Sequence, residues 1–206
     1  MKLATALLIL VLGLAAAAGA QTIVDYGWED SGTVLGMYPA DSIIATNVAG
    51  YDGNPVHAGN FSLKLERVSD GTPQGFVAFL WNLRDGDVIN VGFWRYDVTP
   101  DAAPSGRLWG HWNDELPGNP DGYSGSASGN GDYGLGEGWD YTEWDYTVAG
   151  NTGLVIEARV YSNPGDIIYV DDLHIEAPEH VYIQIPGCSP VSTEEETWGG
   201  VKALYR

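Results

Sequence analysis

The feature of this 206-residue chain that most restricts its fold is a series of short strand-like runs, each followed by turn-forming residues. The runs are rich in β-branched and aromatic residues, and several alternate apolar and polar side chains as a half-buried strand does. No segment after residue 20 has the long 3.6-residue period of a helix. Such a chain is predicted to be all-β, folded as an antiparallel sandwich or barrel. The expected strands are residues 42–47, 62–68, 75–83, 87–98, 107–112, 144–148, 153–162 and 166–175.

Composition agrees with this prediction and narrows the classes of partner. Eight Trp and twelve Tyr favour strands, and 28 Gly supply turns between them. The formal net charge of −19 repels nucleic acid and anionic membrane surfaces, so neither is an expected partner. The same charge suits the binding of hard divalent cations. The single cysteine, Cys188, cannot form a disulfide within the chain.

The N-terminus has the anatomy of a secretory signal peptide over residues 1–20. Lys2 provides a positive start, residues 4–18 are apolar, and Ala18-Gly19-Ala20 matches a cleavage site. The protein is therefore expected to be secreted, to the cell surface, the medium or the periplasm. No later stretch has the ~20 apolar residues of a membrane-spanning helix, so no membrane insertion is expected.

We expect one domain over residues 21–178, followed by a segment of different character. Residues 179–206 are predicted to contain an edge strand, a linker and a C-terminal tail. The tail is either a sorting tag for attachment to the cell surface or a frayed terminus. Within the domain, residues 118–138 form a long Gly-rich and Ser-rich loop, and loops of this length are usually functional or mobile.

The last expected strand places a carboxylate among apolar residues. A buried, unpaired carboxylate costs several kcal/mol, so it is normally protonated, paired or bound to a metal. The carboxylate belongs to Asp171. Because the chain has only nine Lys and Arg, a cation from solution is a candidate partner for it. The alternatives are that Asp171 caps a local turn or pairs with an arginine. Period-2 alternation puts five residues on one face of this strand: Ile167, Tyr169, Asp171, Leu173 and Ile175.

Three expected strands carry rings and charged groups on the side that alternation turns away from the core. Aromatic rings stack on the C–H faces of sugars, polar groups orient the hydroxyls, and arginine pairs with the carboxylate of an acidic sugar. The alternative is that half of these aromatic residues lie in the core, or that a one-residue bulge inverts the Trp94 side chain. The candidate sugar-binding residues are Trp94, Tyr96, Arg107, Trp109, His111, Glu157, Arg159 and Tyr161.

Three motifs in order resemble the jelly-roll carbohydrate-binding modules of families four, nine and twenty-two. The first is Gly27-Trp28-Glu29. The second is the stretch that begins with His57-Ala58-Gly59-Asn60 and ends in Ser62-Leu63-Lys64-Leu65. The third is Tyr169-Val170-Asp171-Asp172-Leu173. Trp28 replaces the phenylalanine that is usual in these modules. The resemblance covers roughly residues 24–177, and the Gly-rich loop has no counterpart in it. It implies an antiparallel jelly-roll β-sandwich that binds a polysaccharide or oligosaccharide.

The resemblance also implies a structural calcium that ties the start of the domain to its closing strand. The ligands carried over are the carboxylates of Glu29 and Asp171 and the backbone carbonyls of Gly27, His57 and Asn60. Calcium takes six to eight oxygen ligands and accepts main-chain carbonyls, so the set is chemically sensible. The imidazole of His57 as a zinc ligand is the weaker alternative, since the four histidines have no metal-ligand spacing.

We therefore expect a secreted, non-catalytic carbohydrate-binding module. The sequence contains no nucleophile elbow, zinc-protease or phosphate-loop motif. A polysaccharide lyase of jelly-roll fold is an alternative, in which His111, Arg159 and Tyr161 would act on an acidic sugar. A calcium-stabilised structural or adhesive surface protein is another.

Overall fold

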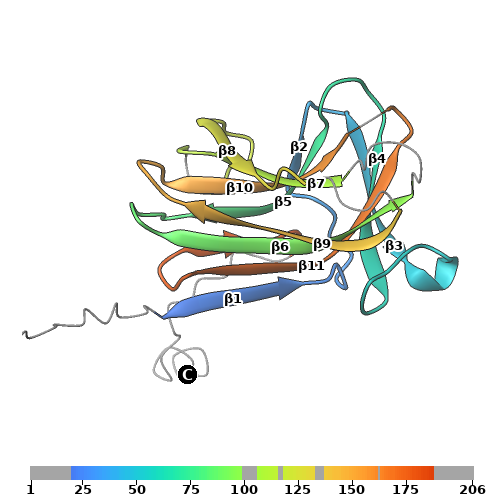
Figure 1. The fold of residues 1–206 in the computed structure, drawn as a ribbon, viewed down its shortest axis with the longest axis horizontal. Helices are drawn as coiled ribbons and strands as arrows, with labels where there is room; N and C mark the ends of the chain where they lie inside the picture. Colours follow the sequence, from blue (N-terminus) through green and yellow to red (C-terminus); the bar gives the residue numbers. More distant parts are fainter. Residues whose placement is uncertain (1–19, 99–105, 116–117, 133–136, 162, 188–206) are drawn as a thin grey trace, which may run out of the picture.

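The computed structural model describes residues 20–98, 106–115, 118–132, 137–161 and 163–187. They form two antiparallel sheets that face each other across one hydrophobic core (Figure 1). The predicted antiparallel jelly-roll β-sandwich is thus confirmed. No helix in the described part of the chain is long and apolar enough to cross a membrane.

Sheet A is organised around its longest strand, β11. One edge of β11 pairs with β6, and the other edge is shared: β4 pairs with residues 167–170 and β1 with residues 173–178. The sheet contains β3 (Ile43–Ala49), β4 (Phe61–Arg67), β11 (Ile167–Pro178), β6 (Val88–Val98) and β9 (Glu137–Thr147) in this order, with β1 (Gln21–Tyr26) beside β11.

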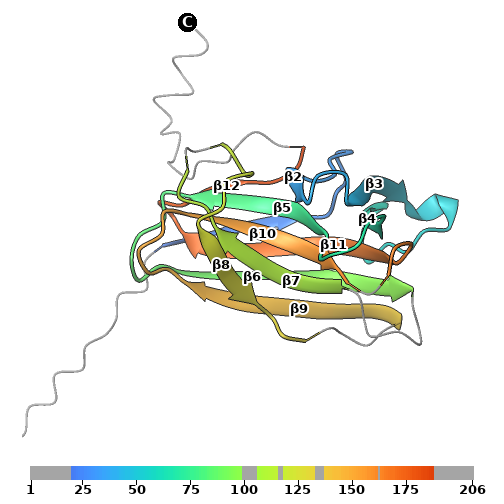
Figure 2. The same cartoon turned by 90° about the horizontal axis from the view of Figure 1, so that it is seen from above.

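Sheet B has β5 and β10 at its centre. Two short strands share the outer edge of β5, β12 at one end and β2 at the other. The sheet contains β12 (Tyr182–Gln184), β5 (Gln74–Trp81), β10 (Gly153–Val160), β7 (Gly106–Trp112) and β8 (Gly125–Gly129) in this order, with β2 (Gly36–Tyr38) beside β5. A single 3₁₀ turn, η1 (Gly50–Asp52), lies at one end of the molecule (Figure 2).

Alternating apolar residues from the two sheets fill the space between them. Val91 and Phe93 on β6 and Leu154 and Ile156 on β10 are fully buried in this core. Burying such a side chain contributes about 1.5–3 kcal/mol. Trp94 next to Phe93 and Glu157 next to Ile156 point to the other side of their strands, and both are residues that the sequence proposed for sugar binding.

Three short strands were not expected, and a fourth strand is longer than expected. β1 and β2 were not expected, and β8 lies inside the stretch expected to be loop, because Gly and Ser carry little strand signal. β9 begins at Glu137 rather than near Trp144, since its first half alternates Trp and Tyr with acidic residues. β12 agrees with the edge strand expected within residues 179–206, and it pairs with β5 at the edge of sheet B.

The expected apolar row on the closing strand is interrupted by a β-bulge. The pairing of β11 with β6 shifts register between Asp171 and His174, and Asp172 has a left-handed φ of 47°. Ile168 and Val170 before the bulge point into the core, and so does Leu173 after it. Asp171 is therefore fully buried, but under a loop on the outer face of sheet A and not in the core. The prediction of a single face from Ile167 to Ile175 was wrong, because a bulge switches the faces of a strand.

Candidate functional site

The structure brings six of the eight predicted sugar-binding residues together on the outer face of sheet B. β7 and β10 pair in register, so that Arg107 lies opposite Arg159 and Trp109 opposite Glu157. Because side chains of directly paired residues project to the same face, these four form one patch. His111 follows on β7, and Tyr161 follows at the end of β10.

Trp94 and Tyr96 lie elsewhere, on the outer face of sheet A. Tyr96 pairs with Tyr169, and its ring meets the rings of Tyr169 and Trp139 edge-on. The Trp94 ring stacks on the imidazole of His57, with 3.9 Å between the ring centres. The alternation of side chains correctly predicted that both rings point away from the core, but it cannot predict which sheet a strand joins. The single eight-residue face is thus divided between opposite sides of the sandwich.

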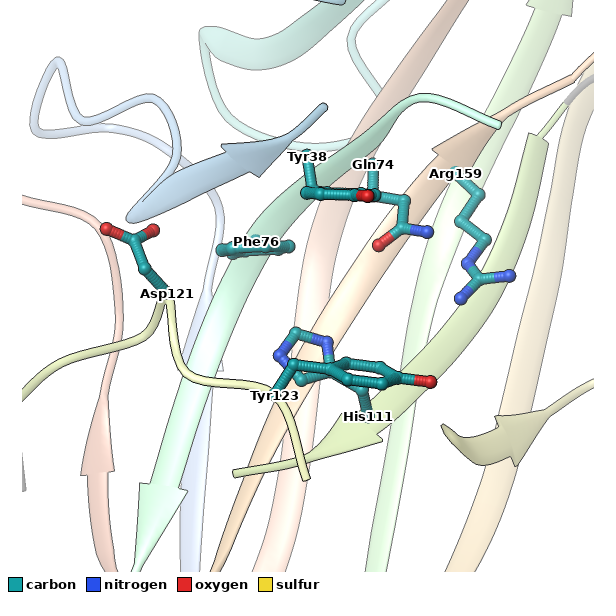
Figure 3. Close-up of a pocket in the computed structure, with 7 residues that line it drawn as sticks. All are labelled: Tyr38, Gln74, Phe76, His111, Asp121, Tyr123 and Arg159. Carbon is teal, nitrogen blue, oxygen red and sulfur yellow. The ribbon is translucent and has the colours of Figure 1, made fainter. Parts of the chain in front are cut away.

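A pocket of about 420 Å³ opens on the outer face of sheet B (Figure 3). Its residues come from β2, β5, β7 and β10 and from the connection between β7 and β8. Arg159 lies at one end and Asp121 at the other, with Phe76 and Tyr123 between them. The pocket is lined by Tyr38, Gln74, Phe76, His111, Asp121, Tyr123 and Arg159.

Five of these lining residues were missed by the sequence-based prediction. Tyr38 lies on the unexpected strand β2 and is 63% exposed, and Tyr123 is 68% exposed. Asp121 and Tyr123 belong to residues 118–138, whose length was the available signal for a functional loop. Gln74 and Phe76 stand on the outer face of β5, an apolar run without an alternation that could have assigned them.

A buried carboxylate organises the floor of the pocket. The side chain of Glu157 is only 1% exposed, and its two oxygens have different partners. One oxygen lies 2.5 Å from Nδ1 of His111, and the other accepts a hydrogen bond from Nε of Arg159 at 2.5 Å. With its amide nitrogen turned toward Glu157, Gln74 donates to the same carboxylate at 3.1 and 3.3 Å. Buried charges are stable when they are paired and hydrogen-bonded in this way.

The partners of Glu157 are held in turn. Nε2 of His111 lies 3.1 Å from the carbonyl oxygen of Gly122, so both imidazole nitrogens are engaged within the protein. Burial lowers the pKa of Arg159, but the Glu157 charge and the hydrogen bonds to Glu157 and Tyr161 outweigh burial and raise it. Arg159 therefore stays charged at neutral pH.

Both arginines of the patch lie against the ring of Trp109. The guanidinium carbon of Arg107 is 4.6 Å from the centre of the Trp109 ring, and that of Arg159 is 4.7 Å away. The indole nitrogen of Trp109 donates to Ser126 on β8 at 3.1 Å. Cation–π contacts of this kind hold both guanidinium groups against the ring.

The residues implied as calcium ligands surround one turn, 57–61. Glu29 accepts backbone N–H bonds from Asn60 at 2.8 Å and from Phe61 at 2.9 Å, which lower its pKa. Asp171 accepts backbone N–H bonds from His57 at 2.9 Å and from Ala58 at 3.2 Å. The two carboxylates thus hold the same turn from opposite ends, and both connect it to distant parts of the chain.

Burial is the largest influence on the protonation of Asp171. Burial raises its pKa to about 6, although three backbone N–H bonds act in the other direction, and neighbouring Asp172 raises it further. Gly27 adjoins both aspartates, since a Cβ there would lie 3.6 Å from Asp171 and 3.5 Å from Asp172. Within the described residues, no three His, Cys, Asp or Glu side chains could hold one metal ion. An ion at this turn would depend on main-chain carbonyls as well.

Comparison with solved structures identifies the fold. The chain is similar to the CBM22-1 xylan-binding domain of Xyn10C from Paenibacillus barcinonensis, with 16% identity, a TM-score of 0.50 and coverage of 79% of this chain and 98% of that one. The fold is that of a carbohydrate-binding module. The chain also matches the CBM22-1–CBM22-2 tandem of the same protein at 15% identity and a TM-score of 0.52, covering 79% of this chain and 47% of that one.

A third similar structure is an adhesin. A cleaved adhesin domain of Lys-gingipain from Porphyromonas gingivalis matches with 13% identity and a TM-score of 0.50, over 75% of this chain and 97% of that one. No protein-family model matches the sequence. No curated protein matches it either. At these identities the structural similarities establish the fold, and the function must be argued from the site.

Proposed function

We propose that this protein is a secreted, non-catalytic carbohydrate-binding module whose polysaccharide site is the outer face of sheet B. The observation that carries this proposal is the 420 Å³ pocket, in which the rings of Tyr38, Phe76 and Tyr123 stand around fixed polar groups. Aromatic faces for the sugar ring and fixed polar groups for its hydroxyls are the two requirements of a sugar site. Secretion rests on the signal-like residues 1–20.

The similar structures give this proposal a first ligand to test. The CBM22-1 domain that shares the fold is described as xylan-binding. We include xylan in a panel of soluble polysaccharides for affinity gel electrophoresis, followed by calorimetry on each polymer that retards the protein. Retardation by at least one polymer is expected. A protein that migrates unchanged on every gel is not a polysaccharide-binding module.

Exposed tyrosines allow the site itself to be tested. Tyr38→Ala and Tyr123→Ala remove rings that line the pocket, and each is expected to weaken binding roughly tenfold, or about 1.4 kcal/mol. Tyr51→Ala is the matched control, because Tyr51 is 79% exposed on η1, away from the pocket. Equal losses in all three variants would place the sugar site elsewhere.

The contacts of both imidazole nitrogens of His111 with protein groups favour a binding protein over a lyase. A lyase needs a base that reaches the substrate, and both nitrogens of the largely buried His111 already face protein groups. We expect no ultraviolet-absorbing unsaturated product from uronate-containing polymers. Accumulation of such a product, and its loss in His111→Ala, would replace the binding module with the lyase.

We also propose a structural calcium at the turn 57–61, held by the carboxylates of Glu29 and Asp171 and by carbonyls of Gly27, His57 and Asn60. The support is that two carboxylates meet at one turn, and that the hydrogen bonds of the buried Asp171 come from backbone N–H groups within the described part of the chain. When bound, the ion would neutralise Asp171 and link the first motif to the closing strand. Excess chelator should then lower the melting temperature and calcium should restore it. Superimposable melting curves would show that the backbone N–H groups alone satisfy these carboxylates.

A further inference from the structure

Both ring nitrogens of His111 face groups that can only accept a hydrogen bond. Nδ1 lies 2.5 Å from a carboxylate oxygen of Glu157, and Nε2 lies 3.1 Å from the carbonyl oxygen of Gly122. A neutral imidazole carries a proton on one nitrogen only, whereas an imidazolium donates from both. The two contacts are therefore both hydrogen bonds only when His111 is protonated.

The carboxylate of Glu157 does not supply the missing proton, because it is surrounded by donors. Its second oxygen accepts from Nε of Arg159 at 2.5 Å, and the amide of Gln74 donates to both oxygens. Donors of this kind stabilise the ionised form of a buried carboxylate. A neutral His111 would then keep its proton on Nδ1 and turn the lone pair of Nε2 toward the Gly122 carbonyl. The two protonation states of His111 thus differ in the contact with Gly122 and not in the contact with Glu157.

Gly122 is the residue through which this contact reaches the pocket. It lies in the connection between β7 and β8, with Asp121 before it and Tyr123 after it, and both of these neighbours line the pocket (Figure 3). Gly122 is itself buried, since a Cβ there would be only 2.4 Å from Oδ1 of Asn113. The Tyr123 ring contacts the imidazole of His111, with 5.4 Å between the ring centres. The bond from Nε2 to Gly122 therefore holds this part of the connection against the floor of the pocket.

The groups around His111 leave it as the titrating group of this pocket near neutral pH. The charged or titratable groups that face it from the neighbouring elements are Glu157 and Arg159 of β10 and Asp121 and Tyr123 of the connection. β5 contributes the ring of Phe76 at 5.2 Å, and β8 pairs with His111 through Ser126; neither side chain ionises. Histidine is the side chain whose unperturbed charge change falls between about pH 5 and 8. His111 is the only histidine among the described residues that line the pocket.

We propose that His111 is a positioning residue whose proton regulates glycan binding on sheet B, an inference that rests on the proposed carbohydrate-binding function. With His111 protonated, Nε2 donates to the carbonyl of Gly122, and Asp121 and Tyr123 stand in place around the sugar. Loss of the proton leaves two acceptors facing each other, which costs free energy and drives the connection away from the floor. Binding is therefore tightest at mildly acidic pH and weakens as the pH rises.

Calorimetry between about pH 5 and 8 tests the proposal on the unaltered protein and on two variants. The probe is soluble xylan, or the polymer of the panel that retards the protein if xylan does not. We expect the affinity of the unaltered protein to fall roughly tenfold across this range, since hydrogen bonds from charged donors are the stronger ones. His111→Gln should give a flat profile, because an amide does not titrate. His180→Gln is the matched control and should keep the slope, because His180 contacts Asp87 at 2.9 Å, outside the pocket.

Nitrogen-15 spectra of the imidazole supply a second measurement that needs no change of affinity. Both nitrogens of His111 should carry protons at the acid end of the range, and only Nδ1 at the alkaline end. A flat affinity profile, a neutral His111 at every pH, or a slope that persists in His111→Gln overturns the regulation and leaves the carbohydrate-binding function standing. Failure to bind any glycan of the panel at any pH overturns both. If His111→Gln does not fold, the profile and the spectra of the unaltered protein still decide the question.

Discussion

Glu157→Gln tests whether the buried carboxylate maintains the floor of the pocket. The substitution keeps the shape of the side chain and removes the charge that pairs with Arg159 and His111. Glutamine also offers one acceptor oxygen in place of two, so hydrogen bonds from Arg159, His111 and Gln74 can no longer all be accepted.

The expected loss of stability follows from the burial of this group. Removing one partner of a buried ion pair costs about 3–5 kcal/mol. The Arg159 side chain is 15% exposed, which places the loss near the lower value, about 3 kcal/mol. In a domain of this size the melting temperature changes by about 2–4 °C per kcal/mol, so a decrease of about 6–12 °C is expected.

Urea unfolding at neutral pH measures the loss, with Glu143→Gln as the control. Glu143 is an exposed acid on β9 of the other sheet, and its substitution should change the free energy of unfolding by no more than about 0.5 kcal/mol. Glycan binding should weaken in Glu157→Gln, because Arg159 is no longer held in position. A loss below about 1 kcal/mol would show that Arg159 turns to solvent freely, and the argument for a preorganised site would fail.

Three further predictions concern sheet A and its loop. Gly59→Ala should destabilise by about 1–2 kcal/mol more than Gly53→Ala. Both glycines have a positive φ, but only at Gly59 would the added Cβ collide with the side chain of Glu29. Equal losses in urea would contradict this. The carboxylate partners of His174 raise its pKa despite burial, so the protonated imidazole should stabilise the fold at acid pH, and this contribution should be lost at alkaline pH. The difference in the free energy of unfolding between the protein and His174→Gln measures it. In excess chelator, the free energy of unfolding should fall as pH rises to about 6, the pKa of Asp171, because burial disfavours the ionised carboxylate. Excess calcium should remove this fall. A fall of equal size in chelator and in calcium would refute the prediction.

The predictions from sequence succeeded where a regular strand alternates. On β7 and β10, alternation predicted that Leu108 and Ile156 point into the core, and the structure places them there. It also predicted that Trp109 and Glu157 point outward, and these two residues pair on the outer face. Such strands are specified locally, because neighbouring side chains decide which face is buried.

The remainder depends on pairings that no local pattern encodes. Trp94 faces outward as expected, but the sheet that β6 joins is decided by its pairing with β9 and β11. Asp171 is buried as expected, yet the reason is a bulge and a covering loop and not an apolar row. Tyr38 and Tyr123 reach the pocket from a three-residue strand and an irregular connection, neither of which has a periodic signal.

The position of β11 has a consequence for how the chain acquires its structure. Gln21 pairs with Pro178, and neither β1 nor β4 contacts β6 as a sheet neighbour without β11 between them. The β3–β4 hairpin and the β6–β9 pair therefore remain separate until the chain has been synthesised through residue 178. Folds dominated by such non-local pairing form slowly, on the order of milliseconds to seconds. A chain of this design completes sheet A only once residue 178 has been synthesised, and the secretion proposed above would require the unfolded state that precedes this step.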